Sequence, residues 1–176
     1  TVGVTTDRHQ ILALERTDPT GSHGALFVGL TRVGSRGRVG IDSDGRPVVD
    51  LGQLTTRDDR ARLTTAVLDA LRLTDDPALR NIATSMSIDA RGTPVEQLDR
   101  DPAAVERWVL DHLTGFHHVA GSCRRGEVTD EDGWMRGYDN LAVADASLFG
   151  EAPPVNIYLA TVLQAEELAR RWLVAT

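Results

Sequence analysis

Three stretches near the end of the chain carry most of the information about its fold. Residues 117–126 read HHVAGSCRRG, residues 133–149 read GWMRGYDNLAVADASLF, and residues 153–169 read PPVNIYLATVLQAEELA. The first reads as a small-residue loop that two adjacent histidines open. The second reads as an apolar strand ending at Asp145, and the third as a helix that follows a Pro-Pro pair with Asn156 at or near its N-cap.

The spacing of apolar side chains supports that last helix. Five residues spaced four, four, three and four positions apart lie on one face of a helix, as expected for a stripe that packs against a core. These positions are Ile157, Thr161, Ala165, Leu168 and Trp172.

The sequence before residue 56 predicts an antiparallel sheet. Short apolar or alternating runs at 11–16 (ILALER), 25–32 (ALFVGLTR) and 38–42 (RVGID) are separated by clusters of Gly, Asp, Pro and Ser. Residues 42–45 read Asp-Ser-Asp-Gly before a further strand at 46–49, and Asp-Gly favours a tight hairpin turn.

Helical periodicity replaces this pattern in the middle of the chain. We expect helices at 57–73, capped by Thr56 or Thr55, and at 77–82. A third starts at Asp101-Pro102 and ends at Thr114-Gly115. The expected buried face of the first helix consists of Leu63, Val67, Ala70 and Leu71. The fold class is therefore α+β, with flanking helices on an antiparallel sheet.

The composition excludes several classes of protein. The 176 residues contain 26 acidic and 19 basic side chains, for a net charge of −7. All 19 basic side chains are arginines. This acidic balance argues against nucleic-acid binding and gives no attraction to an anionic membrane. Cys123 has no partner for an internal disulfide, and no Cys/His set has zinc-site spacing. No apolar run approaches the roughly 20 residues needed to span a bilayer, and no signal-peptide core is present, so we expect a cytoplasmic protein without a membrane segment.

Two features are candidates for carrying chemistry: the adjacent histidines His117 and His118, and Asn156 at the start of the last helix. A histidine has the unperturbed pKa closest to neutral, which makes it the default general base. A helix N-terminus stabilises negative charge, and Asn there supplies a donor and an acceptor. Each signal has a plain structural alternative: a His-His pair on the surface, an Asn that only caps its helix, and Asp145 as a turn residue.

The order and spacing of the three stretches resemble the carboxy-terminal signature of the glucose–methanol–choline (GMC) oxidoreductases. That signature has a His loop with Cys, then a strand ending in Asp-Ala-Ser, then a proline-containing loop and a final helix that Asn or His opens. Upstream, GLTRVGSRGRVGID (29–42) and RPVVDLGQLTTRDDRARL (46–63) resemble the family's substrate-domain run. The resemblance covers residues 25–174.

The resemblance implies an FAD-dependent enzyme that oxidises an alcohol (CH–OH) by hydride transfer to flavin. By position, His118 corresponds to the catalytic base and Asn156 to the second catalytic residue. Asp145 and Ala146 correspond to the flavin contacts, together with Asn156 and Ile157 at the start of the last helix.

Two further residues are candidates for the substrate pocket. Three positions depart from the family pattern, and one of them is Tyr158, which replaces the second Asn of the frequent Asn-x-Asn. His117 and Tyr158 are the implied substrate-binding positions, and packing is an equal alternative for Tyr158. Arg125 replaces the usual Met of the Cys-Arg-Met-Gly loop, and Gly150 replaces a common Pro.

The resemblance also implies a missing half. The family's Gly-x-Gly-x-x-Gly motif for the FAD pyrophosphate is absent, so an amino-terminal FAD-binding half must come from the same cleaved or trimmed chain or from a separate subunit. Residues 1–115 are expected to form part of a substrate-binding domain. Residues 116–176 are expected to supply the catalytic loop, strand and helix that complete the FAD-binding domain.

Three other functions remain open at this point. Thr1 could act as the nucleophile of an N-terminal nucleophile hydrolase. A hydroxynitrile-lyase-like enzyme would keep the His base and the flavin but not the redox step. A non-catalytic binding module derived from the family would lack the cofactor.

Overall fold

The computed structural model describes residues 2–5, 9–15, 17–115 and 117–174, and residues 2–5 by their backbone alone. Thr1, the alternative nucleophile, and Phe116, at the predicted domain boundary, lie outside the described residues. The chain forms two compact units. Unit 1 comprises residues 1–35 and 54–114, and unit 2 comprises residues 36–53 and 115–176.

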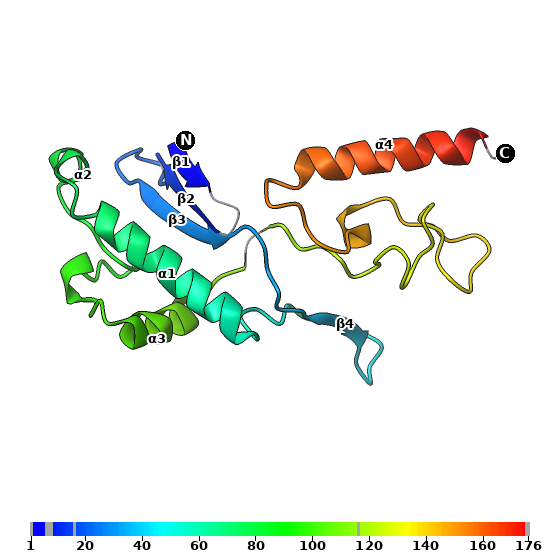
Figure 1. Ribbon diagram of the computed structural model, residues 1–176, viewed down its shortest axis with the longest axis horizontal. Helices are drawn as coiled ribbons and strands as arrows, with labels where there is room; N and C mark the ends of the chain where they lie inside the picture. The colour runs from blue at the N-terminus through cyan, green and yellow to red at the C-terminus, as the bar shows by residue number, and fades with distance from the viewer. Residues whose placement is uncertain (1, 6–8, 16, 116, 175–176) are drawn as a thin grey trace. The chain divides into compact units, whose positions relative to one another are not determined.

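Unit 1 begins with a three-stranded antiparallel sheet (Figure 1). The strands β1 (Val2–Thr5), β2 (His9–Leu14) and β3 (Ala25–Leu30) are paired in the order β1-β2-β3. In the β2–β3 register Ile11 lies opposite Val28 and His9 opposite Leu30. These residues share one face, and β2 and β3 both contact the helix α1 (Arg57–Leu73).

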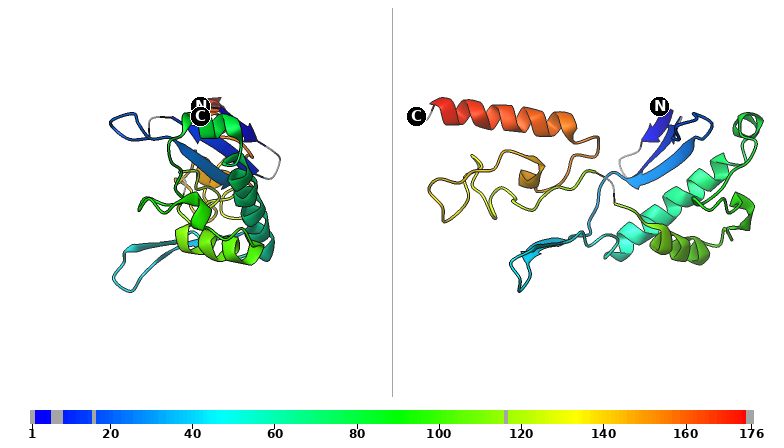
Figure 2. Two further views of the ribbon diagram at one scale, coloured as in Figure 1. Left: turned by 90° about the vertical axis from the view of Figure 1, so that its left-hand side faces the viewer. Right: turned by 180° about the vertical axis from the view of Figure 1, so that it is seen from behind.

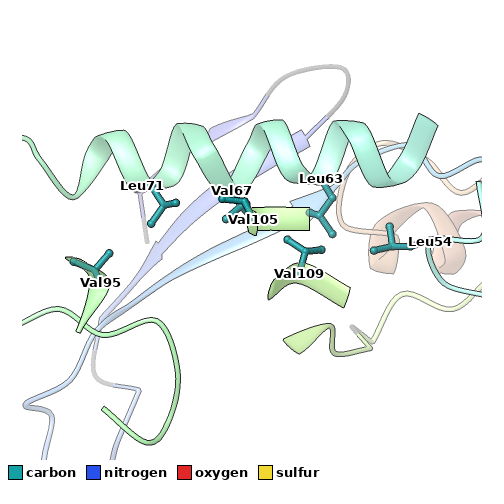
Figure 3. Packing of buried hydrophobic residues seen from close by; sticks show 7 residues of the cluster. All are labelled: Leu54, Leu63, Val67, Leu71, Val95, Val105 and Val109. Atoms are coloured by element: carbon teal, nitrogen blue, oxygen red, sulfur yellow. The ribbon is translucent and has the colours of Figure 1, made fainter. Parts of the chain in front are cut away.

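Helix α1 packs against α3 (Pro102–His112) as well as against the sheet, and the two helices run side by side in Figures 1 and 2. The buried core of unit 1 therefore draws on several elements, including the 3₁₀ turn η1 (Val95–Gln97). Figure 3 shows its seven residues, which are Leu54, Leu63, Val67, Leu71, Val95, Val105 and Val109. Val28 and Leu30 of β3 pack against this cluster.

Side-chain caps mark the starts of α1, α2 (Pro77–Ile82) and α3, and those of α1 and α3 were predicted from the sequence. Thr56 Oγ1 accepts the N–H of Asp59 at the start of α1. Asp76 caps α2, and Asp101 caps α3, each directly before a proline that sits at the first helical position. The end of α3 differs from the prediction, because its last helical residue is His112, before Thr114-Gly115.

The strands β4 (Arg38–Ile41) and β5 (Pro47–Asp50) form a separate antiparallel hairpin that belongs to unit 2. Asp42 fixes its turn, since Asp42 Oδ1 accepts the N–H groups of Asp44 and Arg46 at 2.9 and 2.8 Å. The sequence predicted one antiparallel sheet before residue 56, and the structure divides these strands between two sheets.

The rest of unit 2 contains one long helix, α4 (Tyr158–Val174), and a chain of turns. The predicted strand ending at Asp145 is wrong: Ala142 makes only an isolated bridge to Trp134, and residues 146–148 form a 3₁₀ turn, η2. The Gly-rich sequence around it favours turns over a continuous ladder. The turns nevertheless pack against α4, because Gln164 of the helix donates to the Asp145 carbonyl oxygen. Leu148 and Leu168 are each 1% exposed.

Two tryptophans fix the far end of α4 in the same unit. Trp172 Nε1 donates to the carbonyl oxygen of Asp132 at 2.9 Å, and its ring lies 5.6 Å from that of Trp134. Arg171 of the same turn binds the Asp132 carboxylate at 3.1 Å. The α4 stripe predicted from the sequence is thus the face that anchors the helix.

Candidate functional site

Three backbone hydrogen bonds join the histidine loop to the segment around Asp145. The N–H groups of Gly121, Cys123 and Arg125 donate to the carbonyl oxygens of Ala146, Ser147 and Leu148, at 3.3, 2.9 and 3.3 Å. Every second residue from Gly121 to Arg125 is therefore bound to the 3₁₀ turn η2 (Ala146–Leu148). The loop that begins at the two histidines therefore lies alongside Ala146 at Gly121.

The close approach of the two segments depends on a glycine. Gly121 has φ +84°, and a Cβ added there would lie 3.0 Å from the carbonyl oxygen of Phe149. Any side chain at this position would strain the backbone and crowd η2. His118, three residues earlier, is half-buried, whereas His117 is exposed.

The side chain of Asp145 forms hydrogen bonds within its own turn. Its carboxylate accepts the N–H of Ser147 at 2.8 Å and the Ser147 hydroxyl at 2.5 Å. This is the turn-residue interpretation that the sequence left open. The backbone carbonyl oxygens of Asp145 and Ala146 are also engaged, because they accept the N–H groups of Leu148 and Gly121.

A buried amide connects α4 to the same turn. Gln164 is 9% exposed, and its Nε2 donates to the Asp145 carbonyl oxygen at 2.9 Å. The sequence analysis did not single out Gln164. The available signal was its position on the apolar face of the helix, between Thr161 and Leu168, where a polar residue needs a hydrogen-bonding partner.

Asn156 lies two residues before the first residue of α4. Its Oδ1 accepts the N–H of Tyr158 at 2.9 Å, so the capping alternative is correct as far as the oxygen is concerned. The bond orients the amide and leaves its Nδ2 hydrogens available to donate elsewhere. Ile157 is buried, with 7% exposure, and its carbonyl oxygen starts the helix by accepting the Thr161 N–H. Tyr158 is exposed.

The first turn of α4 offers further donors. In the described part of the chain, the N–H groups of Leu159 and Ala160 have no hydrogen-bond acceptor in the protein. Such groups carry the positive end of the helix dipole, worth about 0.3–1 kcal/mol to a nearby negative charge at an exposed position.

Arg125 keeps a charged group within the loop. It is partly buried, and its Nε is shielded from solvent without a hydrogen-bond partner in the protein. The neighbouring Arg124 is used structurally, because its Nε donates to the Gly121 carbonyl oxygen at 3.2 Å and its Nη1 binds Glu127.

Metal chemistry and membrane insertion find no support in the described residues. Nowhere in residues 9–15, 17–115 and 117–174 do three or more His, Cys, Asp or Glu side chains gather as a metal site would require. None of the helices in that part of the chain is long and apolar enough to cross a bilayer.

Comparison with known proteins gives one consistent family. Residues 33–165 match the sequence pattern of the GMC oxidoreductases. The oxygen-dependent choline dehydrogenase of Chromohalobacter salexigens is 32% identical over 162 residues, which cover 85% of this chain and 27% of that protein. The 5-(hydroxymethyl)furfural oxidase of Methylovorus sp. is 28% identical over 135 residues, covering 70% of this chain and 25% of that protein. The chain thus spans about a quarter of the length of the relatives that it matches.

Solved structures agree with the sequence matches. Pyridoxine 4-oxidase from Mesorbium loti has a TM-score of 0.73 and 25% identity, over 94% of this chain and 34% of its own. Formate oxidase from Aspergillus oryzae RIB40 has a TM-score of 0.74 and 19% identity, over 93% and 31%, and shows likeness of fold. The pattern match over most of the chain and the choline dehydrogenase identity show that this chain belongs to the GMC oxidoreductase family, corresponding to its carboxy-terminal domain.

Proposed function

We propose that this chain is the carboxy-terminal part of an FAD-dependent enzyme that oxidises an alcohol, with His118 as the base. The single observation that carries the proposal is the set of hydrogen bonds around Asp145 and Ala146. One side of this turn is bound to the histidine loop, and the other is bound to α4 through Gln164. The loop that follows the proposed base, the proposed flavin contacts and the helix that follows Asn156 are therefore joined by hydrogen bonds.

The residues at the start of α4 suit the proposed cofactor. FAD, when bound, supplies the acceptor for the hydride of the substrate, and its ring becomes negatively charged as it is reduced. The unpaired N–H groups of Leu159 and Ala160 are the kind of donors that favour such a charge. Asp145, Ala146, Asn156 and Ile157 would hold the cofactor, the first two chiefly through the backbone.

The chain's own side chains then divide the work on the substrate. The His118 imidazole accepts the hydroxyl proton of the alcohol, the role of a general base. The Asn156 amide donates from Nδ2 to the substrate oxygen, since its Oδ1 is engaged by the Tyr158 N–H. His117 and Tyr158, both exposed, contribute to the rim of the substrate pocket.

An amino-terminal FAD-binding half is part of the proposal. The relatives are about four times as long as their matched segment, and the Gly-rich pyrophosphate motif is absent from these 176 residues. The carboxy-terminal unit would complete the FAD-binding domain supplied by that half, whether the two parts lie on one polypeptide or on two.

The substrate class follows from the names of the relatives. A choline dehydrogenase, a 5-(hydroxymethyl)furfural oxidase and a pyridoxine 4-oxidase all take molecules that carry a CH–OH group. We infer a small alcohol as the substrate, with a carbonyl compound as the product.

Flavin reduction under anaerobic conditions tests the proposal. The complete enzyme should lose its yellow absorbance when a substrate alcohol is added. His118→Ala should slow this reduction by about 10²–10⁴-fold. His117→Ala is the matched control, and it should alter the apparent affinity for the alcohol more than the limiting rate.

Two outcomes would overturn the proposal. Unchanged reduction by the His118→Ala enzyme would remove His118 as the base. A flavin that never bleaches, in an enzyme that cleaves a cyanohydrin, would instead identify a hydroxynitrile-lyase-like activity. A complete protein that binds no flavin would favour the non-catalytic binding module.

A further inference from the structure

A polar residue occupies one of the buried positions of α4. Among the described residues of this helix, Gln164 and Leu168 are the buried ones, at 9 and 1% exposure. Burying an amide costs free energy unless it is hydrogen-bonded, and an apolar residue of similar size avoids that cost. The packing of α4 therefore does not by itself require an amide here, which directs attention to the bond that the amide makes.

That bond holds a single carbonyl group. Gln164 Nε2 donates to the carbonyl oxygen of Asp145 at 2.9 Å, and the Leu148 N–H donates to the same oxygen at 3.2 Å. The carbonyl is thus held both by the helix and by its own turn. Thr161, one turn earlier on α4, does not take the place of Gln164, because its hydroxyl donates to the Ile157 carbonyl oxygen.

A fixed carbonyl group also fixes the amide of the next residue. The peptide unit between Asp145 and Ala146 is planar and trans, so its N–H points away from its C=O. In the part of the chain that the structure describes, the Ala146 N–H has no hydrogen-bond acceptor. Gln164 therefore sets, from the opposite side of the peptide, the direction of a donor that a ligand can use.

We propose that Gln164 is a positioning residue for the flavin cofactor. It holds the Asp145 carbonyl oxygen and thereby keeps the Ala146 N–H in position to donate to the cofactor. This inference rests on the proposed function, in which Asp145 and Ala146 hold FAD chiefly through the backbone. Gln164 acts through this peptide and does not itself contact the flavin.

Gln164→Met in the complete enzyme separates positioning from stability. Methionine is as long as glutamine but carries no donor, so it keeps α4 packed and removes the bond to Asp145. Thermal unfolding should occur at or above the wild-type temperature. FAD binding to the apoenzyme, measured by fluorescence titration, should weaken by about 2- to 10-fold, as expected for one lost hydrogen bond. The visible spectrum of the bound flavin should shift as well.

Gln164→Glu offers a rescue that depends on pH. An ionised carboxylate repels the Asp145 carbonyl oxygen, whereas a protonated carboxyl group donates to it. Burial favours the protonated form, because it raises the pKa of a carboxyl group. The FAD affinity of this variant, relative to that of the wild type at the same pH, should therefore recover as the pH is lowered. The relative affinity of Gln164→Met should stay low.

Leu168→Met is the matched control, because it changes the other buried residue of α4 at nearly constant volume and leaves the bond to Asp145 in place. It should bind FAD as the wild type does. Wild-type FAD affinity in Gln164→Met would overturn the inference. A Gln164→Met protein that loses thermal stability together with FAD affinity, or a Gln164→Glu protein that does not recover at lower pH, would show a purely structural role instead.

The result separates this inference from the proposed function. Flavin that binds and bleaches normally in Gln164→Met would leave the function standing and reject the positioning role. Weaker flavin binding in that variant, in an enzyme whose wild-type flavin never bleaches with an alcohol, would support the positioning role and reject alcohol oxidation. A complete protein that binds no flavin would reject both.

Discussion

The Asp59 carboxylate is fully buried at the start of α1, where it accepts four hydrogen bonds from other segments or its own helix. Ser35 donates through its N–H and its hydroxyl at 2.6 and 2.5 Å, Gly34 donates through its N–H at 3.1 Å, and Arg62 adds an ion pair. Burial alone would raise the pKa of Asp59, but the hydrogen bonds from Ser35 and Gly34 outweigh it and hold the pKa at about 2, below the usual 3.8.

This network makes the stability of unit 1 depend on pH in an acid window. The pKa is lower in the folded protein, so the stabilisation is complete above about pH 4 and is lost as the pH falls toward about 2. We expect Asp59 to contribute about 2 kcal/mol to the free energy of unfolding at neutral pH. Urea unfolding of wild type and Asp59→Asn between those pH values should show a steeper loss of stability with falling pH in the wild type.

The neighbouring Asp58 provides the control for that measurement. Its side chain is exposed and pairs with Arg62. Asp58→Asn should therefore retain most of the wild-type stability and its pH dependence. An Asp59→Asn protein with the same acid slope as the wild type would contradict the assignment of this slope to Asp59.

Substitutions at Asn156 can distinguish the role of its amide oxygen from that of its amide nitrogen. Asn156→Asp keeps an oxygen to accept the Tyr158 N–H but removes the Nδ2 donor. We expect α4 to keep its stability, since an acidic group is favourable near a helix N-terminus, while flavin reduction in the complete enzyme slows by about 10²–10³-fold. Thermal unfolding and anaerobic stopped-flow reduction measure the two effects.

Asn156→Ala removes both the Oδ1 acceptor and the Nδ2 donor, so it should lower the stability of α4 as well as the rate of flavin reduction. Equal reduction rates in Asn156→Asp and the wild type would show that the residue is only a cap.

At the scale of elements, Gly133 decides how closely the turn region approaches α4. It has φ +80°, and a Cβ there would lie 2.6 Å from the Val143 carbonyl oxygen and 3.4 Å from Leu168 of the helix. We expect Gly133→Ala to destabilise unit 2 by about 1–3 kcal/mol. The Trp134–Trp172 pair lies beside it, so tryptophan fluorescence during urea unfolding reports the change.

Gly137 is a close control, with φ +83° and open space around its Cα. Gly137→Ala carries the backbone strain without the clash, so it should cost less than Gly133→Ala. Equal destabilisation by the two variants would show that the approach to α4 is not tight.

Elements with strong local signals were predictable from the sequence. Helix α1 begins and ends where the Thr56 cap and the apolar spacing predicted, and the Asp42–Gly45 turn of the hairpin is confirmed. The segment before Asp145 was not predictable in the same way. Its alternating residues look like a strand, but a strand needs a continuous partner, and pairing is a tertiary property that local sequence does not contain.

For the candidate site, the sequence supplied residues but not their connections. His118, Asp145 and Asn156 were found because the order of their motifs resembles a family. Gln164, which links α4 to the Asp145 carbonyl, belongs to no such motif, and its donor role depends on the packed position of the helix. The occupation of the Asn156 oxygen by Tyr158 likewise depends on where α4 begins, which is at Tyr158.

At the scale of the whole molecule, the hairpin is an insertion within unit 1. Ser35 and Leu54, on either side of it, both belong to unit 1, and Ser35 Oγ accepts the Thr56 N–H at 3.1 Å. The chain ends at its base are close together, so the closing loop costs little entropy. Replacing residues 37–52 by a short Gly linker should change the stability of unit 1 by less than about 1 kcal/mol.

Hydrogen exchange of the α1 and α3 amides measures that stability directly. Retained slow exchange is the expected result. Loss of protection in both helices would show that unit 1 depends on the hairpin.

The interleaved path of the chain also sets rules for anyone who wishes to produce its parts. The polypeptide passes from one unit to the other after residues 35, 53 and 114, so no single cut yields two intact pieces. Expression of residues 115–176 alone would omit the hairpin segment 36–53, which belongs to the same unit. Expression of residues 1–114 would retain that segment although it does not belong to unit 1. Fragment design must therefore follow the three-dimensional grouping, with residues 36–53 excised from one product and grafted onto the other.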